Sequence, residues 1–295
     1  TDLPEQDTSI ATLTKEPKTV ENVVSEVQKT PKVQAPQPVV NDPSDTNLSA
    51  IPDEPIWKKM SKKFEAHPRK GRIAIILRDI VFQANNLEVL LASIPKTTTL
   101  AINPYSETSA MDARLIRRDG FEFLMMLPME PVEYPIKDPG AKGLLTTISK
   151  NANLERLNWI LEKSNGYYGL INNMGGAFLR APKQLEPIFE TLKKRELVFV
   201  NSLGLDKNIG QNLAQEEGIP YISVDLTVDN ILIEEDINRQ LRSLELLAEE
   251  YGYAIGVINT YPLSIKNYVE WAEHINRTPT LQLVPLSNIL IKKPK

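Results

Sequence analysis

Short apolar runs alternate with amphipathic segments along the chain from residue 72 onward. The runs are continuous, as in strands that a parallel sheet buries on both faces. We predict strands at residues 72–77, 98–103, 121–127, 167–171, 196–200, 220–224, 253–258 and 281–285. Between most of these runs, apolar residues recur about every 3.6 positions, which predicts helices. The helices are expected at residues 84–93, 107–118, 152–163, 184–195, 207–217, 230–251 and 266–276.

Strand and helix alternate about seven times, which predicts the α/β class with a mainly parallel sheet. A closed or nearly closed (β/α) barrel and an open doubly wound sheet both satisfy this pattern. In either architecture a functional site lies at the carboxyl ends of the strands. The sequence has no GxGxxG after its first strand and no GxxxxGK, which disfavours a nucleotide-binding domain.

The predicted helix at residues 230–251 has the most regular apolar stripe. Asp229 or Asn230 is expected to cap its first turn, because short polar side chains accept hydrogen bonds from free backbone N–H groups there. Glu234 and Glu235 would complement the helix dipole near the same end.

A short amphipathic helix is predicted just before the first strand. Asp53 is expected to cap it, and Pro55 suits its first turn. Trp57, Met60 and Phe64 fall on one face, and lysines occupy most of the rest. We expect this stripe to pack on the domain, although a basic amphipathic helix also suits a membrane surface.

The chain divides into three regions. Residues 1–53 are rich in proline and contain no aromatic residue, so we predict a flexible, disordered tail or linker. Residues 54–70 contain the connecting helix, and residues 71–295 form the α/β domain. The chain begins at Thr1 rather than Met, which we interpret as a trimmed or processed product that has lost any export signal or membrane anchor.

Composition removes several classes of site. The 295 residues carry a net charge of −4, which argues against a nucleic-acid partner. The absence of cysteine excludes disulfides, thiolate zinc sites and iron–sulfur clusters. The two histidines, His67 and His274, lie in separate polar segments and are expected at the surface. No apolar run reaches the roughly 18 residues that span a bilayer.

Polar side chains recur directly after the predicted strands. They are Arg78, Asp79, Asn103, Tyr105, Glu130, Asp138, Asn172, Asn173, Asn201, Asp225, Asp229 and Asn259. Each one alone has an ordinary structural explanation; Asp79, for example, could cap a helix, and Glu130 could accept bonds from backbone N–H groups in a turn. Their recurrence at successive strand ends indicates a pocket, although it does not show that the pocket is reactive.

Several segments together resemble the divergent polysaccharide deacetylase family from about Arg72 to Leu286. They include RIAIILRDI, TLAINPYS, GFEFLMMLPMEP, YPIKDPGAKGLLTT and GYYGLINNMGGAF. The stretch LPMEP followed by DPG and LLT is the most specific part. The resemblance implies a deformed (β/α) barrel and a periplasmic or cell-envelope location. It also implies descent from enzymes that use a divalent metal such as zinc to remove acetyl groups from amino sugars.

The sequence departs from the family pattern at the positions that would hold the metal. The family has two acidic residues after the first strand, whereas this chain has Arg78 and Asp79. Neutral side chains fill other positions where the family often has His or Asp, namely Met126, Asn173, Asn201 and Asn259. An amide is a weak zinc ligand, and the fixed charge of an arginine opposes a cation. We therefore predict that the metal site and deacetylation are lost, and that the chain has no cofactor.

Three functions stay open. The leading hypothesis is a catalytically inactive barrel that binds a glycan, such as a peptidoglycan fragment, or an envelope protein. Its predicted pocket comprises Arg78, Asn103, Tyr105, Met126, Asn172, Asn173, Asn201, Asp229 and Asn259, with Tyr167, Tyr168 and Tyr261 as further rings for stacking on sugars. The second is an active hydrolase whose acid and base come from Asp79, Glu130, Asp138 and Asp229, or which holds a harder metal ion such as magnesium or calcium. The third is a scaffold that holds a protein partner through the tail or residues 54–68.

Overall fold

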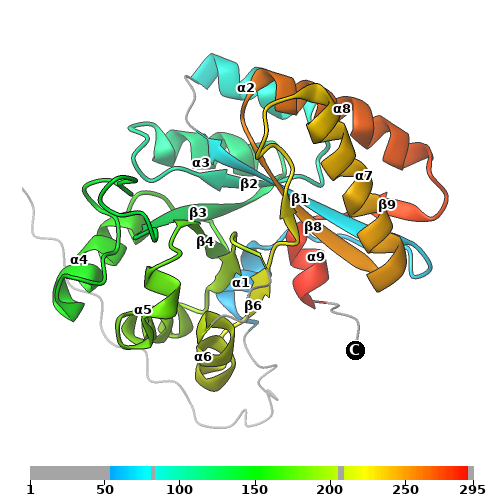
Figure 1. Ribbon diagram of the computed structural model, residues 1–295. Coiled ribbons are helices and arrows are strands. Elements are labelled where there is room, and N and C mark those ends of the chain that lie inside the picture. Colours follow the sequence, from blue (N-terminus) through cyan, green and yellow to red (C-terminus); the bar gives the residue numbers. More distant parts are fainter. Residues whose placement is uncertain (1–53, 81–83, 205–208, 292–295) are drawn as a thin grey trace, which may run out of the picture. The chain divides into compact units, whose positions relative to one another are not determined.

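The computed structural model describes residues 54–80, 84–204 and 209–291 (Figure 1). The predicted tail at residues 1–53 and the expected cap Asp53 lie outside these ranges. None of the helices in the described ranges is long and apolar enough to cross a membrane.

Within the described residues, nine strands form one sheet. They are β1 (Gly71–Ile80), β2 (Thr99–Ile102), β3 (Glu122–Met129), β4 (Gly169–Met174), β5 (Val198–Asn201), β6 (Tyr221–Ser223), β7 (Leu226–Thr227), β8 (Tyr253–Asn259) and β9 (Leu281–Leu283). All eight predicted strands are present. The additional strand β7 has two residues, too few to show a hydrophobic period.

The helices match the predicted amphipathic segments closely. They are α1 (Ile56–Met60), α2 (Ala84–Ser93), α3 (Ser109–Arg118), α4 (Lys150–Leu161), α5 (Pro182–Lys194), α6 (Ile209–Glu217), α7 (Glu234–Tyr251), α8 (Pro262–Arg277) and α9 (Leu286–Ile291), with a 3₁₀ turn η1 (Phe178–Arg180). The short helix α9 was not predicted.

The sheet is a deformed, nearly closed barrel. Its strand order is β6-β5-β4-β3-β2-β1-β8-β7, every pair is parallel, and β9 pairs with the start of β1. Only Val224 and Asp225 separate β6 from β7, although these strands end the order on opposite sides. Val224 N donates to Asn201 O on β5, and Asp225 N donates to Ile255 O on β8, both at 2.9 Å.

These two bonds bring the edges of the sheet together. Three Cα–Cα steps span at most about 11 Å, so β5 and β8 lie on either side of this short connection. β6 and β7 therefore act as one split strand that continues the ring from β5 to β8. The predicted deformed barrel is confirmed, and the open doubly wound alternative is wrong.

The two faces of the sheet bury different apolar layers. On β1, Ile73, Ile75 and Leu77 face the outer layer beneath the helices, whereas Ala74 and Ile76 face the barrel interior. Figure 1 shows α2 to α8 around the outside of the sheet. Interior side chains from the other strands complete the inner core, including Ala101, Leu124, Met126, Ile171, Val200, Ile222, Ile255 and Val257.

Two short helices close the barrel at the amino ends of the strands. Trp57 from α1 and Leu286 and Ile289 from α9 are buried in the inner core, and Met60 and Phe64 pack against it. The apolar stripe predicted before the first strand therefore packs on the domain.

The helix itself is shorter than predicted, because α1 ends at Met60 and Phe64 lies beyond it. The chain turns extended at Ser61, whose hydroxyl donates to Trp57 O at 2.6 Å. The next amide, Lys62 N, donates to the Glu122 carboxylate at 2.9 Å instead of continuing the helix.

Glu122 is a fully buried carboxylate that ties this closed end together. Oε1 accepts from Thr99 Oγ1 at 2.7 Å, from Tyr168 OH at 3.1 Å and from Ser287 N at 3.2 Å. Oε2 accepts from Lys62 N at 2.9 Å and from Ser287 Oγ at 2.5 Å. One side chain on β3 thus joins β2, the start of β4, the chain after α1, and α9.

We expect Glu122→Ala to lower the free energy of unfolding by about 3 kcal/mol, because it leaves several buried donors without an acceptor. Glu122→Gln, which keeps one carbonyl oxygen, should cost less. Urea unfolding measures both. The exposed Glu155→Ala on α4 is the matched control and should change stability by about 0.5 kcal/mol or less. A loss below about 1 kcal/mol for Glu122→Ala would show that the network does not hold the closed end.

Candidate functional site

The carboxyl end of the barrel carries polar side chains where the inner core ends. Arg78 follows the interior residue Ile76 by two positions on β1, so it faces the same way. Asn259 occupies the paired position on β8, and Arg78 Nε donates to Asn259 Oδ1 at 2.8 Å. The guanidinium therefore lies at the mouth of the barrel, fixed to the neighbouring strand.

Asp229 extends this pair into a chain of charges and amides. Its carboxylate is 4% exposed and accepts from Asn259 Nδ2 at 2.8 Å and from Asn259 N at 2.9 Å. Ser264 Oγ on α8 donates to it at 2.7 Å. The Asn259 amide thus connects a guanidinium on one side to a buried carboxylate on the other.

The predicted capping role of Asp229 is wrong. Helix α7 begins at Glu234, its cap position is Ile233, and no side chain caps it. Asp229 is engaged by β8 and α8 instead, so the chain leaves β7 through an exposed loop before the helix starts. The Ser264 partner gave no sequence signal, because a serine in the first turn of a helix is common.

The charge of Arg78 is fixed. Burial of the guanidinium lowers the pKa of Arg78, whereas Asp229, Asp79 and Tyr261 act in the opposite direction and raise it. Because an arginine side chain is effectively always protonated in a protein, the group stays charged at every pH of interest. The mouth of the barrel therefore holds a permanent positive charge.

Asp79 adopts a left-handed backbone conformation with φ of 65°, which is unusual for a residue other than glycine. Its amide donates to Met126 Sδ at 3.3 Å, and its carbonyl accepts from Thr260 Oγ1 at 3.1 Å. Asn103 Nδ2 donates to Asp79 Oδ1 at 2.8 Å. These contacts hold the exposed carboxylate beside Arg78, and such held strain is frequent at functional sites.

Asn173 lies half-buried at the end of β4, two residues after the interior residue Ile171. Within the described ranges the side-chain amide of Asn173 makes no hydrogen bond. Met174 and Gly175 follow with φ of 60° and 101°, which turns the chain away from the barrel directly after it. Asn173 therefore presents an unused amide at the same end as Arg78 and Asp79.

Glu130 does not join this cluster. Its carboxylate accepts from Thr146 N at 2.5 Å and from Thr146 Oγ1 at 2.9 Å, and it is 8% exposed. Its carbonyl accepts from Ala177 N and Phe178 N at 3.1 and 3.2 Å. Glu130 holds two loops together, which is the structural alternative that the sequence left open.

Two predicted amides are also structural. Asn172 is buried, accepts from Ser202 N at 2.8 Å and donates to Met174 O at 2.6 Å. Asn201 is fully buried and bonds Gly204 O and Leu203 N at 2.9 and 3.0 Å. Both fix the turns that leave β4 and β5.

Of the four tyrosines considered for stacking, only Tyr261 lies beside Arg78 with an exposed ring, at 48%. Tyr105 is 39% exposed, but its hydroxyl donates to Pro139 O at 3.1 Å and accepts from Lys142 N at 2.9 Å. Tyr167 and Tyr168 are buried and bond Leu161 O and Glu122.

These side chains do not fit a zinc ion. The described residues contain no group of three or more His, Cys, Asp or Glu side chains arranged to hold a metal. Asp79 is the one exposed carboxylate in the cluster, and the Arg78 guanidinium lies beside it with a charge that repels a cation. The Met126 thioether already accepts the Asp79 amide.

Comparison with known proteins places this arrangement in a family. The family model described as divergent polysaccharide deacetylase matches residues 75–290. The uncharacterized protein YibQ of Escherichia coli is 24% identical over 221 residues, covering 75% of this chain and 67% of the relative. An uncharacterized protein of Haemophilus influenzae is 23% identical over 221 residues, with 75% and 77% covered.

A solved structure has the same fold. The crystal structure of an uncharacterized protein from Agrobacterium tumefaciens superposes with a TM-score of 0.75 at 26% sequence identity, covering 80% of this chain and 95% of that one. The family match spans β1 to α9 and therefore includes the polar cluster at the barrel mouth. The chain belongs to the divergent polysaccharide deacetylase family.

Proposed function

We propose that this chain is a non-catalytic member of its family that binds a glycan, such as a peptidoglycan fragment, at the carboxyl end of its barrel in the cell envelope. The observation that carries the proposal is the Arg78–Asn259–Asp229 chain. It supports the loss of the metal, because the family resemblance assigns ligands of a divalent ion to these positions and the chain has a fixed cation and a neutral amide there.

Hydrolysis without a metal has little support. A general acid and a general base must both reach the scissile group. Glu130 is bound to Thr146, and Asp229 is bound to Asn259 and Ser264, so neither carboxylate is available. Asp138 is also exposed, but it lies in the loop between β3 and α4 and accepts from Gly140 N at 2.8 Å. Of the residues that the structure describes, Asp79 is the one exposed carboxylate in the cluster around Arg78, which leaves one carboxylate there for two roles.

The polar groups at the mouth match sugar chemistry. Asn173 and Asp79 offer donors and acceptors for hydroxyl groups, and Arg78 adds a fixed donor fork. The exposed Tyr261 ring offers an apolar surface on which a pyranose face can pack. The contacts that hold Asp79 fix its conformation before a ligand binds. Binding therefore loses less conformational entropy at this residue.

A protein partner at the same end is the second candidate. Ile231, Leu232 and Ile233 are consecutive and exposed by 54%, 47% and 51%, in the loop between Asp229 and α7. Three exposed aliphatic residues in a row are unusual unless they contact something. This loop extends the third hypothesis, because it offers a partner site apart from the tail and residues 54–68.

The glycan proposal predicts that Tyr261→Ala weakens binding to chitooligosaccharides or peptidoglycan about five- to tenfold, through loss of the ring contact. Asn173→Leu should weaken it similarly, because it removes a free amide. Tyr251→Ala is the control, since this tyrosine is also exposed but lies at the end of α7. Equal binding by all variants in a pull-down would remove the glycan version of the proposal.

The loss of the metal predicts no stoichiometric zinc after soaking and dialysis, and no acetate release from amino-sugar polymers. A variant with Arg78→Asp and Asn173→His restores a carboxylate and an imidazole, so it should hold more zinc than the parent. Elemental analysis measures both. One zinc per parent chain, removed by Asp79→Asn, would overturn the inactive-barrel account.

A further inference from the structure

The chain that leads into the barrel carries a concentration of positive charge. Residues 54–72 contain two acidic residues and seven basic ones, in a protein whose net charge is −4. We call these seven the basal basic surface: Lys58, Lys59, Lys62, Lys63, Arg69, Lys70 and Arg72. Such a local excess of one sign creates an attractive field for an oppositely charged partner.

This segment is held rigidly across the amino ends of the strands. His67 N donates to Gln282 Oε1 on β9 at 2.9 Å, and Gln282 Nε2 returns a bond to His67 O at 2.9 Å. Asn288 Nδ2 on α9 donates to Phe64 O at 3.1 Å. The basal basic surface is therefore a fixed part of the barrel, at the end opposite Arg78 and Asp79.

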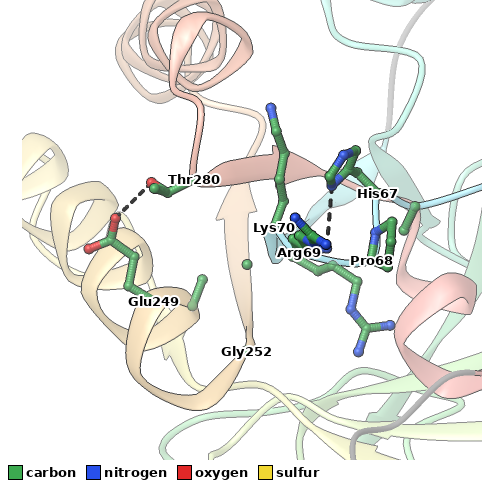
Figure 2. A pocket seen from close by; sticks show the side chains of 11 residues that line it. His67, Pro68, Arg69, Lys70, Glu249, Gly252 and Thr280 are labelled. Atoms are coloured by element: carbon green, nitrogen blue, oxygen red, sulfur yellow. Dashed lines mark hydrogen bonds between the residues drawn. The ribbon is translucent and has the colours of Figure 1, made fainter.

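A cavity of about 680 Å³ opens on this surface (Figure 2). His67, Arg69 and Lys70 line one side, and Glu249 and Thr280 line the other. Among the described residues, Glu249 is the one acidic residue that lines the cavity. Its Oε1 atom already accepts a hydrogen bond from Thr280 Oγ1 at 3.0 Å. The cavity has room for an anionic group next to several cations.

Gly71 also lines this cavity, where β1 passes the end of α7. A Cβ atom on residue 71 would lie 2.6 Å from Ala248 O, so only glycine permits this approach. The carbonyls at the end of α7 have no basic residue in their own last turn. Arg69, Lys70 and Arg72 line the same cavity, so their positive charges lie near that negative helix end.

Aliphatic side chains accompany the charges. A second hollow of about 240 Å³ is lined by three lysines, two glutamates and an exposed isoleucine. These residues are Lys58, Lys62, Lys63, Glu54, Glu65 and Ile291, the last being 48% exposed. Ile56, at the start of α1, is 41% exposed. Lysine and arginine combined with exposed aliphatic residues are typical of surfaces that lie on a membrane.

We propose that the basal basic surface docks on an anionic lipid surface, with a headgroup phosphate entering the cavity beside Arg69 and Lys70. The basic residues lie around both hollows, and exposed aliphatic side chains lie among them. A free phosphate ion would need only one of the two hollows. Docking in this way turns the carboxyl end of the barrel away from the membrane. The candidate glycan site would then face outward, but the inference does not depend on that site.

The test is cosedimentation of the full chain with vesicles of phosphatidylglycerol and phosphatidylcholine, compared with phosphatidylcholine alone. We expect binding to the anionic vesicles that weakens steeply with added salt. Replacing Lys59, Lys63 and Arg69 by Gln should weaken it about a hundredfold, at about fivefold per cation.

The control replaces the exposed Lys137, Lys150 and Lys183 by Gln, which changes the net charge equally at the opposite end. This variant should bind within about twofold of the parent. Equal losses in both variants would overturn the proposal, because binding would then follow overall charge. Titration with inorganic phosphate and with single-stranded DNA separates other anions: tight binding of either without vesicle binding would also overturn it.

Discussion

Polar side chains at the mouth of the barrel are arranged around the guanidinium of Arg78. Arg78 is bonded to the Asn259 amide, which is bonded in turn to the buried Asp229 carboxylate. The charge of arginine cannot be removed by a change of pH. The Arg78 guanidinium therefore repels a cation at this end of the barrel at every pH. Asp79, Asp229 and Tyr261 all lie close enough to Arg78 to interact with that charge.

The two ends of the barrel are built for different purposes. At the amino end, a buried carboxylate gathers donors from four parts of the chain, and two short helices close the interior. The outer surface of that closed end is basic. At the carboxyl end the interior stays polar, with a strained Asp79 and an exposed Tyr261 ring. The buried network that ties chain segments together thus lies at one end, and the strained Asp79 and exposed Tyr261 lie at the other.

Periodicity predicted most of the fold, because buried strands and amphipathic helices each leave a repeat in the sequence. Its failures have local causes. Helix α1 stops at Met60 because Glu122, distant in sequence, takes the amide of Lys62. Helix α7 starts late because Asp229 serves Asn259 and Ser264. A contact between residues far apart in the chain has no period, so pattern alone could not reveal it.

The sequence predicted the location of the candidate site better than it predicted which residues form it. Strand ends located Arg78, Asp79 and Asn259, which lie together, and Asn173, which lies at the same end of the barrel. The same rule also selected Glu130, Asn172 and Asn201, whose hydrogen bonds are used to hold turns. Residue type and position do not distinguish an amide that binds a ligand from one that binds its own backbone. The basal cavity was missed because that rule looks only at carboxyl ends, although the run of lysines and arginines was visible.

The most direct test is a crystal of this protein soaked in zinc and measured at the zinc absorption edge. The account predicts no anomalous peak within bonding distance of Asp79, and a guanidinium of Arg78 that still contacts Asn259. A well-occupied peak bonded to Asp79, with Arg78 turned aside, would contradict it.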